Sequence, residues 1–358
     1  MSDLAQSAQP SAYALAGVDI DAGERAVELM KQHVARTRRP EVLGGLGGFA
    51  GFFDATALQS YRHPVLATST DGVGTKVAIA QAMDVHDTIG FDLLGMLVDD
   101  LVVVGAEPLF VTDYIATGRV VPERIAAIVS GIARACEQAG CALLGGETAE
   151  HPGLLEPDEY DIAGATTGVV EYDRILGPER VRAGDVAIGI DSSGLHSNGY
   201  SLVRRVLLQD AGWALDRHVD DLGRTLGEEL LTPTRVYARD VLALVDAVEV
   251  HAMSHVTGGG LANNLARVVP DFLSVQVDRA SWTPAPIFGL VQQVGGVSQP
   301  DIEATLNMGI GMVVLLPEAA AESAIDLLSA RGLGARVIGT TVPADAGTPR
   351  VQLVGSHR

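Results

Sequence analysis

Residues 70 to 76, with the sequence TDGVGTK, are the most informative stretch of this chain. The apolar run at 64–67 precedes them and predicts a β-strand that ends here. The stretch combines the carboxylate of Asp71 and the ammonium group of Lys76 with two glycines and a hydroxyl. Glycines let backbone N–H groups approach an anion, an Asp can bind Mg²⁺, and a Lys can neutralise phosphate oxygens. The pattern therefore favours a metal–nucleotide site, and the structural alternative is a tight turn with an incidental charge pair.

A glycine-rich stretch, GGLGGFAG at 44–51, lies upstream. Its Gly45-x-Gly47-x-x-Ala50 pattern formally matches a dinucleotide-binding fingerprint. That fingerprint needs a strand before it and a helix after it, and only Val42 and Leu43 precede it here as apolar residues. We interpret the stretch as a loop that closes over phosphates, with a flexible connector as the alternative. The predicted ATP contacts are Gly44, Gly45, Gly47, Gly48, Asp71, Gly72, Gly74, Thr75 and Lys76.

Acidic residues downstream are candidate Mg²⁺ ligands. Asp100 borders an apolar run at 101–104, and Glu147 follows a predicted strand at 142–144. Mg²⁺ typically takes one or two carboxylates together with substrate phosphates. We therefore predict Asp71 and Asp100 as ligands, with Glu147 as a weaker third.

Two further acids lie in the predicted helix over 88–104. Asp92 and Asp99 are seven residues apart and therefore share a helix face. For Asp92 we predict a solvated position on that face.

The composition limits the classes of partner. The chain has 358 residues, 47% of them apolar, and a formal net charge of −20, which argues against binding to nucleic acid or an anionic membrane. No apolar stretch reaches the length of a membrane span, and the first residues lack the features of a signal peptide. Cys136 and Cys141 show no metal-ligand spacing, so we expect buried free thiols and a cytoplasmic protein.

Strands and helices alternate along the whole chain, which predicts an α/β protein. A polar stretch with glycine and proline at 171–185 separates two halves. We predict a flexible segment at 1–22, an N-terminal α/β domain at 23–171, a C-terminal domain at 172–345 and a tail at 346–358.

Six segments besides TDGVGTK combine to a pattern along nearly the whole chain: AGVDIDAG (16–23), TRRPEVLGGLGGF (37–49), DDLVVVGAEPLF (99–110), GGETAE (145–150), SSGLHSNGYSLVR (192–204) and HVTGGG (255–260). Together these segments resemble the phosphoribosylformylglycinamidine cyclo-ligases, the aminoimidazole ribonucleotide synthetases of purine biosynthesis. In one respect the chain differs, because the family often has Asn-Asp-Leu where this chain has Asp99-Asp100-Leu101, which leaves the role of residue 99 open.

The resemblance implies a two-domain fold, with an N-terminal α/β domain that binds ATP and forms a homodimer through its sheet, and a C-terminal α/β/α domain. It implies ATP- and Mg²⁺-dependent ring closure of formylglycinamidine ribonucleotide, a small-molecule substrate. Phosphorylation of the formamide oxygen would create a good leaving group, with Lys76 stabilising charge and His255, or else His196, accepting a proton. The expected substrate contacts are Ser192, Ser193, His196, Ser197, Asn198, Thr257, Gly258 and Gly259.

Other functions stay open at this point. Thiamine-monophosphate kinases, hydrogenase-maturation dehydratases and selenophosphate synthetases share the scaffold. The last group would be expected to carry an N-terminal cysteine beside a lysine, and the first cysteine here is Cys136. A nicotinamide-dependent oxidoreductase and a non-catalytic nucleotide sensor are the remaining alternatives.

Overall fold

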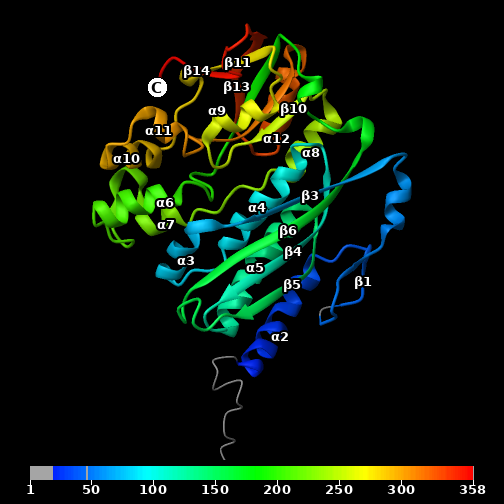
Figure 1. Cartoon of the computed structure of the whole chain (residues 1–358), viewed down its shortest axis with the longest axis vertical. Helices are drawn as coiled ribbons and strands as arrows, with labels where there is room; N and C mark the ends of the chain where they lie inside the picture. Colours follow the sequence, from blue (N-terminus) through cyan, green and yellow to red (C-terminus); the bar gives the residue numbers. More distant parts are fainter. Residues whose placement is uncertain (1–18, 46, 358) are drawn as a thin grey trace, which may run out of the picture.

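The computed structural model describes residues 19–45 and 47–357, which form two α/β domains, so the predicted fold class is confirmed (Figure 1). The N-terminal domain is built on a four-stranded sheet whose strands run in the order β3-β6-β4-β5. All neighbours in this sheet are antiparallel except β4 and β5, which are parallel and are joined by a helix. The strands are β3 (Pro64–Gly72), β4 (Glu107–Thr117), β5 (Ala142–Glu150) and β6 (Tyr160–Glu171).

Two helices, α4 (Ile89–Val102) and α5 (Pro122–Ala139), cover one face of this sheet (Figure 1). Helix α5 begins with Pro122, whose missing N–H costs nothing there, and ends at Gly140, whose φ of +85° suits glycine. Helix α4 is apolar around almost its whole circumference and is nearly completely buried, which is expected of a helix enclosed between two layers. The remaining elements of this domain are α2 (Ile20–Arg36), α3 (Val77–Met83), β1 (Val42–Leu43) and β2 (Phe52–Phe53).

The C-terminal domain contains a six-stranded sheet in the order β10-β12-β7-β13-β11-β14. Helices α8 (Ala238–Ala247) and α12 (Ala321–Ala330) pack against one face, and α9 (Gly260–Leu265) packs against the other, so the domain has three layers. The strands are β7 (Asp185–Asp191), β10 (Ala252–His255), β11 (Leu273–Asp278), β12 (Ile310–Pro317), β13 (Ala335–Pro343) and β14 (Val351–Val354).

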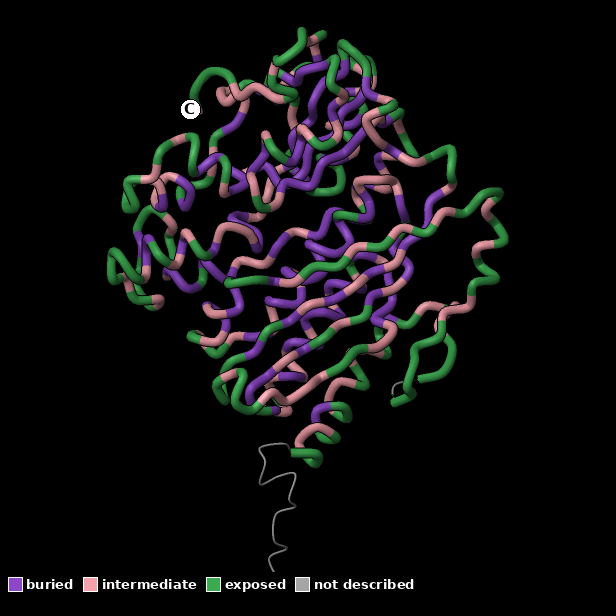
Figure 2. The backbone as a smooth tube through the Cα atoms, in the orientation of Figure 1, coloured by how far each residue is buried: buried purple, intermediate pink, exposed green. Residues whose placement is uncertain are grey.

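One hydrophobic cluster joins the domains, since it runs from Leu93 and Leu97 of α4 to Leu244 of α8 and Met253 of β10. Buried segments lie in both domains and on both sides of their junction (Figure 2). The short helices α6 (Tyr200–Val203), α7 (Leu226–Leu230), α10 (Pro286–Gly295) and α11 (Gln299–Glu303) complete the second domain.

Two predicted boundaries were wrong. Helix α2 already begins at Ile20, because the Asp19 carboxylate accepts a hydrogen bond from Ala22 N and caps the helix; residues 1–18 of the predicted flexible segment lie outside the described residues. The predicted tail contains β14, which pairs in parallel with β11 and so belongs to the sheet. The predicted domain boundary at 171 falls on the last residue of β6. In the described part of the chain, no helix is long and apolar enough to cross a membrane.

Candidate active site

Three predicted site residues meet where the two domains join. Asp71 lies near the end of β3, Asp100 in α4, and His255 at the end of β10. His255 Nδ1 lies 3.0 Å from Asp100 Oδ1. Partial burial raises the pKa of Asp71, the charge of Asp100 raises it further, and the Gly72 N–H and His255 oppose the shift. Two carboxylates that repel each other in this way form an environment suited to a divalent cation.

A cavity of about 470 Å³ opens beside Asp71 and is lined from both domains. The first domain contributes Asp71 to Thr75, and the second contributes Ser197 to Ser201. The third segment, Thr257 to Gly259, lies close by, because a Cβ atom added at Gly258 would lie 3.4 Å from Asn198 Oδ1. The structure thus brings TDGVGTK together with two loops that are far away in the sequence.

Lys76, by contrast, does not reach this cavity. Its side chain is completely buried, and its Nζ atom donates to Asp92 Oδ1 at 2.7 Å, to the His196 carbonyl at 2.9 Å and to the Thr232 carbonyl at 2.7 Å. An ammonium group has three N–H donors, and all three are used. The structure therefore does not place the Lys76 ammonium group with the other predicted phosphate contacts, which line the cavity beside Asp71.

The prediction of a solvated Asp92 was also wrong. Asp92 is fully buried because the second domain covers this face of α4, and its Oδ1 also accepts from Thr234 N at 3.0 Å and Thr234 Oγ1 at 2.6 Å. Burial raises the pKa of Asp92 and lowers that of Lys76, and the attraction between the two charges opposes both shifts.

Asp99, whose role the sequence left open, is also buried at the junction. It accepts a hydrogen bond from the backbone N of Tyr237 at 3.0 Å, one residue before α8 begins. An acceptor in this position satisfies a donor that the helix leaves free. Asp99 therefore joins α4 of the first domain to α8 of the second.

His196 is buried and adopts a left-handed conformation with φ of +61°, which is uncommon for residues other than glycine. Its Nε2 accepts a hydrogen bond from Ser193 N at 3.1 Å, which assigns the proton to Nδ1. Burial lowers the pKa of His196 well below its usual range, so the ring is neutral. Among the described residues, neither His196 Nδ1 nor His255 Nε2 has a hydrogen-bond partner.

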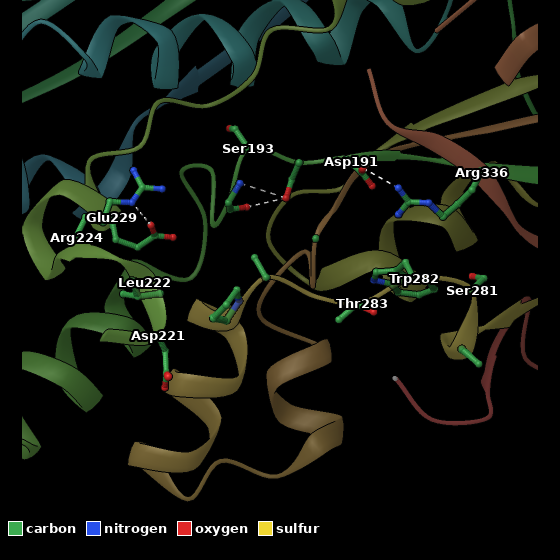
Figure 3. Close-up of a pocket in the computed structure, with 16 residues that line it drawn as sticks. Asp191, Ser193, Asp221, Leu222, Arg224, Glu229, Ser281, Trp282, Thr283 and Arg336 are labelled. Carbon is green, nitrogen blue, oxygen red and sulfur yellow. Dashed lines mark hydrogen bonds and ion pairs between the residues drawn. The ribbon is translucent and has the colours of Figure 1, made fainter. Parts of the chain in front are cut away.

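Ser192 and Ser193, predicted to bind substrate, line a different cavity of about 730 Å³ in the second domain (Figure 3). Ser192 Oγ donates to the Gly194 carbonyl at 2.8 Å, and Ser193 Oγ donates to the Pro233 carbonyl at 2.7 Å. Figure 3 shows two ion pairs at this cavity, and the atoms that form them are Arg336 Nη2 with Asp191 Oδ2 at 2.7 Å and Arg224 Nε with Glu229 Oε2 at 2.8 Å. The hydroxyl groups of the two serines therefore bond within the protein, and neither serine lines the cavity beside Asp71.

Ser197 is also engaged within the protein, since its hydroxyl donates to the Val73 carbonyl at 2.7 Å. This bond ties the loop that bears His196 to the TDGVGTK turn. Asn198 donates only to the weak acceptor Met96 Sδ, at 3.2 Å. Asn198 is therefore the side chain of this loop that is best placed to exchange partners for a ligand.

The glycine-rich loop and Glu147 lie at the other edge of the N-terminal sheet. Gly44 and Gly45 border a cavity of about 310 Å³ beside β5, and Glu147 belongs to β5 itself. Gly146 of β5 is separated from Asp71 of β3 by β4 and β6, about 14 Å at the usual spacing of strands. A single chain therefore does not bring the glycine-rich loop or Glu147 to Asp71.

The dinucleotide interpretation of the glycines was wrong as well. The two-residue strand β1 precedes the loop, and the strand β2 follows it instead of a helix. No backbone N–H groups of a helix start are therefore available at this loop.

The connection at 231–237, LTPTRVY, between α7 and α8 also contributes to the junction, although no sequence pattern predicted it. This segment supplies Thr232, Thr234 and Tyr237 to the three contacts described above with α4 and Lys76. Its only signal in the sequence is a short polar stretch between two helical patterns, which is typical of any loop.

Comparison with known proteins matches both halves of the chain. Residues 54–170 match the family model described as AIR synthase related protein, N-terminal domain, and residues 182–352 match the corresponding C-terminal domain. A phosphoribosylformylglycinamidine cyclo-ligase from Shouchella clausii is 53% identical over 335 residues, which cover 94% of this chain and 97% of that protein. The cyclo-ligase from Geobacillus kaustophilus is 50% identical and the match covers 92% of this chain and 94% of that protein.

Solved structures share the fold at much lower identity. A thiamine-monophosphate kinase from Stenotrophomonas maltophilia has a TM-score of 0.65 at 20% identity, covering 92% of this chain and 96% of that chain. The hydrogenase maturation protein HypE in complex with ATP has a TM-score of 0.65 at 21% identity, and the match covers 95% of this chain and 94% of that chain. Likeness at these identities shows a common fold and leaves the reaction to be decided by the closer relatives.

Proposed function

The chain belongs to the phosphoribosylformylglycinamidine cyclo-ligase family, and we propose that its chemistry takes place at the junction between its two domains. It catalyses the ATP-dependent ring closure of formylglycinamidine ribonucleotide to 5-aminoimidazole ribonucleotide, ADP and phosphate, a step of de novo purine biosynthesis. The observation that carries this conclusion is 53% identity to a cyclo-ligase over 94% of the chain.

Asp71 and Asp100 are the residues that we propose as Mg²⁺ ligands. The mutual influence of their charges fits a site that needs a cation for balance. Within the described residues, no group of three or more His, Cys, Asp or Glu side chains could hold a metal. Two carboxylates suit Mg²⁺ that also binds phosphates and water, and the ion would neutralise charge on the phosphate groups.

We propose that ATP phosphates lie against the turn from Asp71 to Thr75, at the cavity between the domains. Glycine at 74 has no side chain and lets an anion approach the backbone of this turn, whereas the Gly72 N–H already donates to Asp71 Oδ1 at 2.7 Å. The ribonucleotide would lie against Asn198 on the other wall of this cavity and extend to the neighbouring segment from Thr257 to Gly259. This arrangement places the two substrates on opposite domains, so that docking of the domains sets their distance.

His255 is the general base that we favour over His196. Its Nδ1 is oriented by Asp100, which leaves Nε2 as the proton acceptor. The acceptor nitrogen of His196 is already occupied by Ser193 N–H, so His196 can only donate a hydrogen bond from Nδ1. His196 therefore suits the binding or orientation of a carbonyl or phosphate oxygen better than proton removal.

We further propose that the protein is a homodimer whose N-terminal sheets face each other. The face of the sheet opposite α4 and α5 exposes Leu66 at 60% and Tyr114 at 41%. A two-fold axis through this face would reverse the order of the strands in the partner. The partner's glycine-rich loop, with Gly44 to Gly48, could then approach Asp71, which its own chain does not achieve.

The proposed location is the cytoplasm, supported by the free, buried thiols of Cys136 and Cys141. The experiment that tests the function is a phosphate-release assay with ATP and formylglycinamidine ribonucleotide, together with controls that omit each substrate. We expect phosphate only when both substrates are present. Release with ATP and thiamine monophosphate instead would assign the chain to the kinase branch of the fold.

A further inference from the structure

The most completely satisfied charged group of the junction is the ammonium of Lys76. Its three acceptors are Asp92 from its own domain and the carbonyls of His196 and Thr232 from the other domain. The Lys76 side chain is 0% exposed, and the ring of Tyr200, also buried, lies 5.4 Å from Nζ. A phosphate could gain this donor only if an existing acceptor lost it.

The two carbonyls belong to the two segments that the second domain presses against α4. His196 lies in the loop that also carries Ser197 and Asn198, and Thr232 is the second residue of the connection at 231–237. The left-handed backbone at His196 is a conformation that surrounding contacts must maintain. The bond from Lys76 Nζ to the His196 carbonyl is such a contact.

The carboxylate of Asp92 pairs with the buried ammonium group of Lys76 and balances its charge. It also accepts two hydrogen bonds from Thr234 of the second domain. Removing one partner of a buried ion pair leaves an uncompensated charge, whereas removing both charges is often tolerated. Replacing Lys76 alone should therefore be more damaging than replacing Lys76 and Asp92 together.

We propose that Lys76 is a positioning residue that, with Asp92, holds the loop bearing His196 and Asn198 against Asp71 and Asp100, and that it does not bind ATP. The proposal rests on the function proposed above, because that function defines the site being held in place. It reassigns the Lys of TDGVGTK from the nucleotide to the junction between the domains.

The test compares three variants: Lys76→Met, Asp92→Asn and the double variant. Asn at 92 keeps an oxygen that can accept from Thr234. We expect Lys76→Met alone to lower kcat/KM for the ribonucleotide by about a hundredfold or more, in line with the cost of an unpaired buried charge. The double variant should recover at least about tenfold of this loss, since no charge remains unpaired.

The decisive measurement is the Kd for ATP–Mg²⁺ by calorimetry, which does not require turnover. We expect the Kd in the double variant to stay within about twofold of the wild type, while the KM for the ribonucleotide rises because Asn198 is less well held. A tenfold weaker ATP affinity would assign Lys76 to the nucleotide and overturn the proposal. If Lys76→Met does not fold, the double variant alone decides.

A matched control separates positioning from general stability. Arg279 forms a partly buried ion pair with Glu303 inside the second domain, with Nε to Oε1 at 2.6 Å. Arg279→Met should lower thermal stability but leave the KM for both substrates unchanged. A double Lys76/Asp92 variant that is no more active than Lys76→Met would also refute the proposal. Absence of phosphate release by the wild type would instead refute the proposed function and leave the ATP measurement valid.

Discussion

His255 Nδ1 and Asp100 Oδ1 lie 3.0 Å apart across the junction of the two domains. The histidine ends β10 of the C-terminal domain, and the aspartate lies near the end of α4 of the N-terminal domain. This contact links the proposed general base to a proposed metal ligand. Neither domain alone therefore contains the site.

The metal assignment predicts that Asp71→Asn raises the Mg²⁺ concentration needed for half-maximal activity by about tenfold or more, because loss of a ligand charge should exceed the effect of losing a supporting contact. The measurement is an Mg²⁺ titration of phosphate release. Asp326→Asn on the exposed face of α12 is the control, since it lies in the C-terminal domain away from Asp71, and it should leave the requirement unchanged. An equal shift in both variants would contradict the assignment of Asp71 as a ligand.

The preference for His255 as general base predicts that His255→Ala lowers kcat by about 10²- to 10⁴-fold, the usual contribution of a proton acceptor. ATP binding, measured by calorimetry, should be preserved. His196→Asn is the comparison, because Asn tolerates the left-handed backbone at this position. A larger fall in kcat for His196→Asn than for His255→Ala would reverse the assignment.

The glycine-rich loop is predicted to close over ATP. Trypsin should cleave the free protein after Arg38, because Pro40 blocks cleavage after Arg39. ATP–Mg²⁺ should slow this cleavage, because a closed loop is a poor protease substrate. Cleavage at the same rate with and without nucleotide would argue against a lid.

The dimer prediction concerns the open face of the N-terminal sheet. Leu66→Glu should convert a dimer into monomers, because it places a charge within the proposed apolar contact. Light scattering at micromolar concentration gives the mass directly. Phe272→Glu changes a residue that is 66% exposed in the C-terminal domain and should leave the dimer intact. A wild-type mass equal to one chain would refute the prediction.

The sequence predicted best those features that depend on local pattern. Helix α5 shows this, because Pro122 and Gly140 signal its two ends within the element itself. Asp71, Asp100 and His255 could be proposed from their positions at the ends of apolar runs. Their meeting at one site was expected from the family resemblance and not from any spacing in the sequence.

The environment of Lys76 could not be predicted in this way. Its acceptors come from residues 16, 120 and 156 positions away in the chain, and two of them are backbone carbonyls, which every residue has. Asp92 looked solvated because a charged residue on a helix usually faces water, and only the docking of the second domain excludes water there. The distance between the glycine-rich loop and Asp71 follows from strand order, which composition does not encode.

A last prediction concerns Asp113 on β4, a carboxyl group outside the proposed site. Burial raises its pKa to about 7, and the hydrogen bond from its own backbone N–H opposes this shift only in part. Its Oδ1 lies where a side chain at Gly146 would otherwise be, since a Cβ atom there would approach to 2.1 Å. The native state therefore binds this proton more tightly than the unfolded chain does. By linkage, stability is lost as the pH rises from about 4 to about 7, and the full penalty is present above pH 7.

Asp113→Asn removes the ionisable group with little change in shape. Its melting temperature should exceed that of the wild type at pH 8, and the difference should shrink towards pH 5. Thermal melts at several pH values measure this, with Asp326→Asn on the exposed face of α12 as the control. A difference that stays constant between pH 5 and pH 8 would show that Asp113 does not titrate in this range.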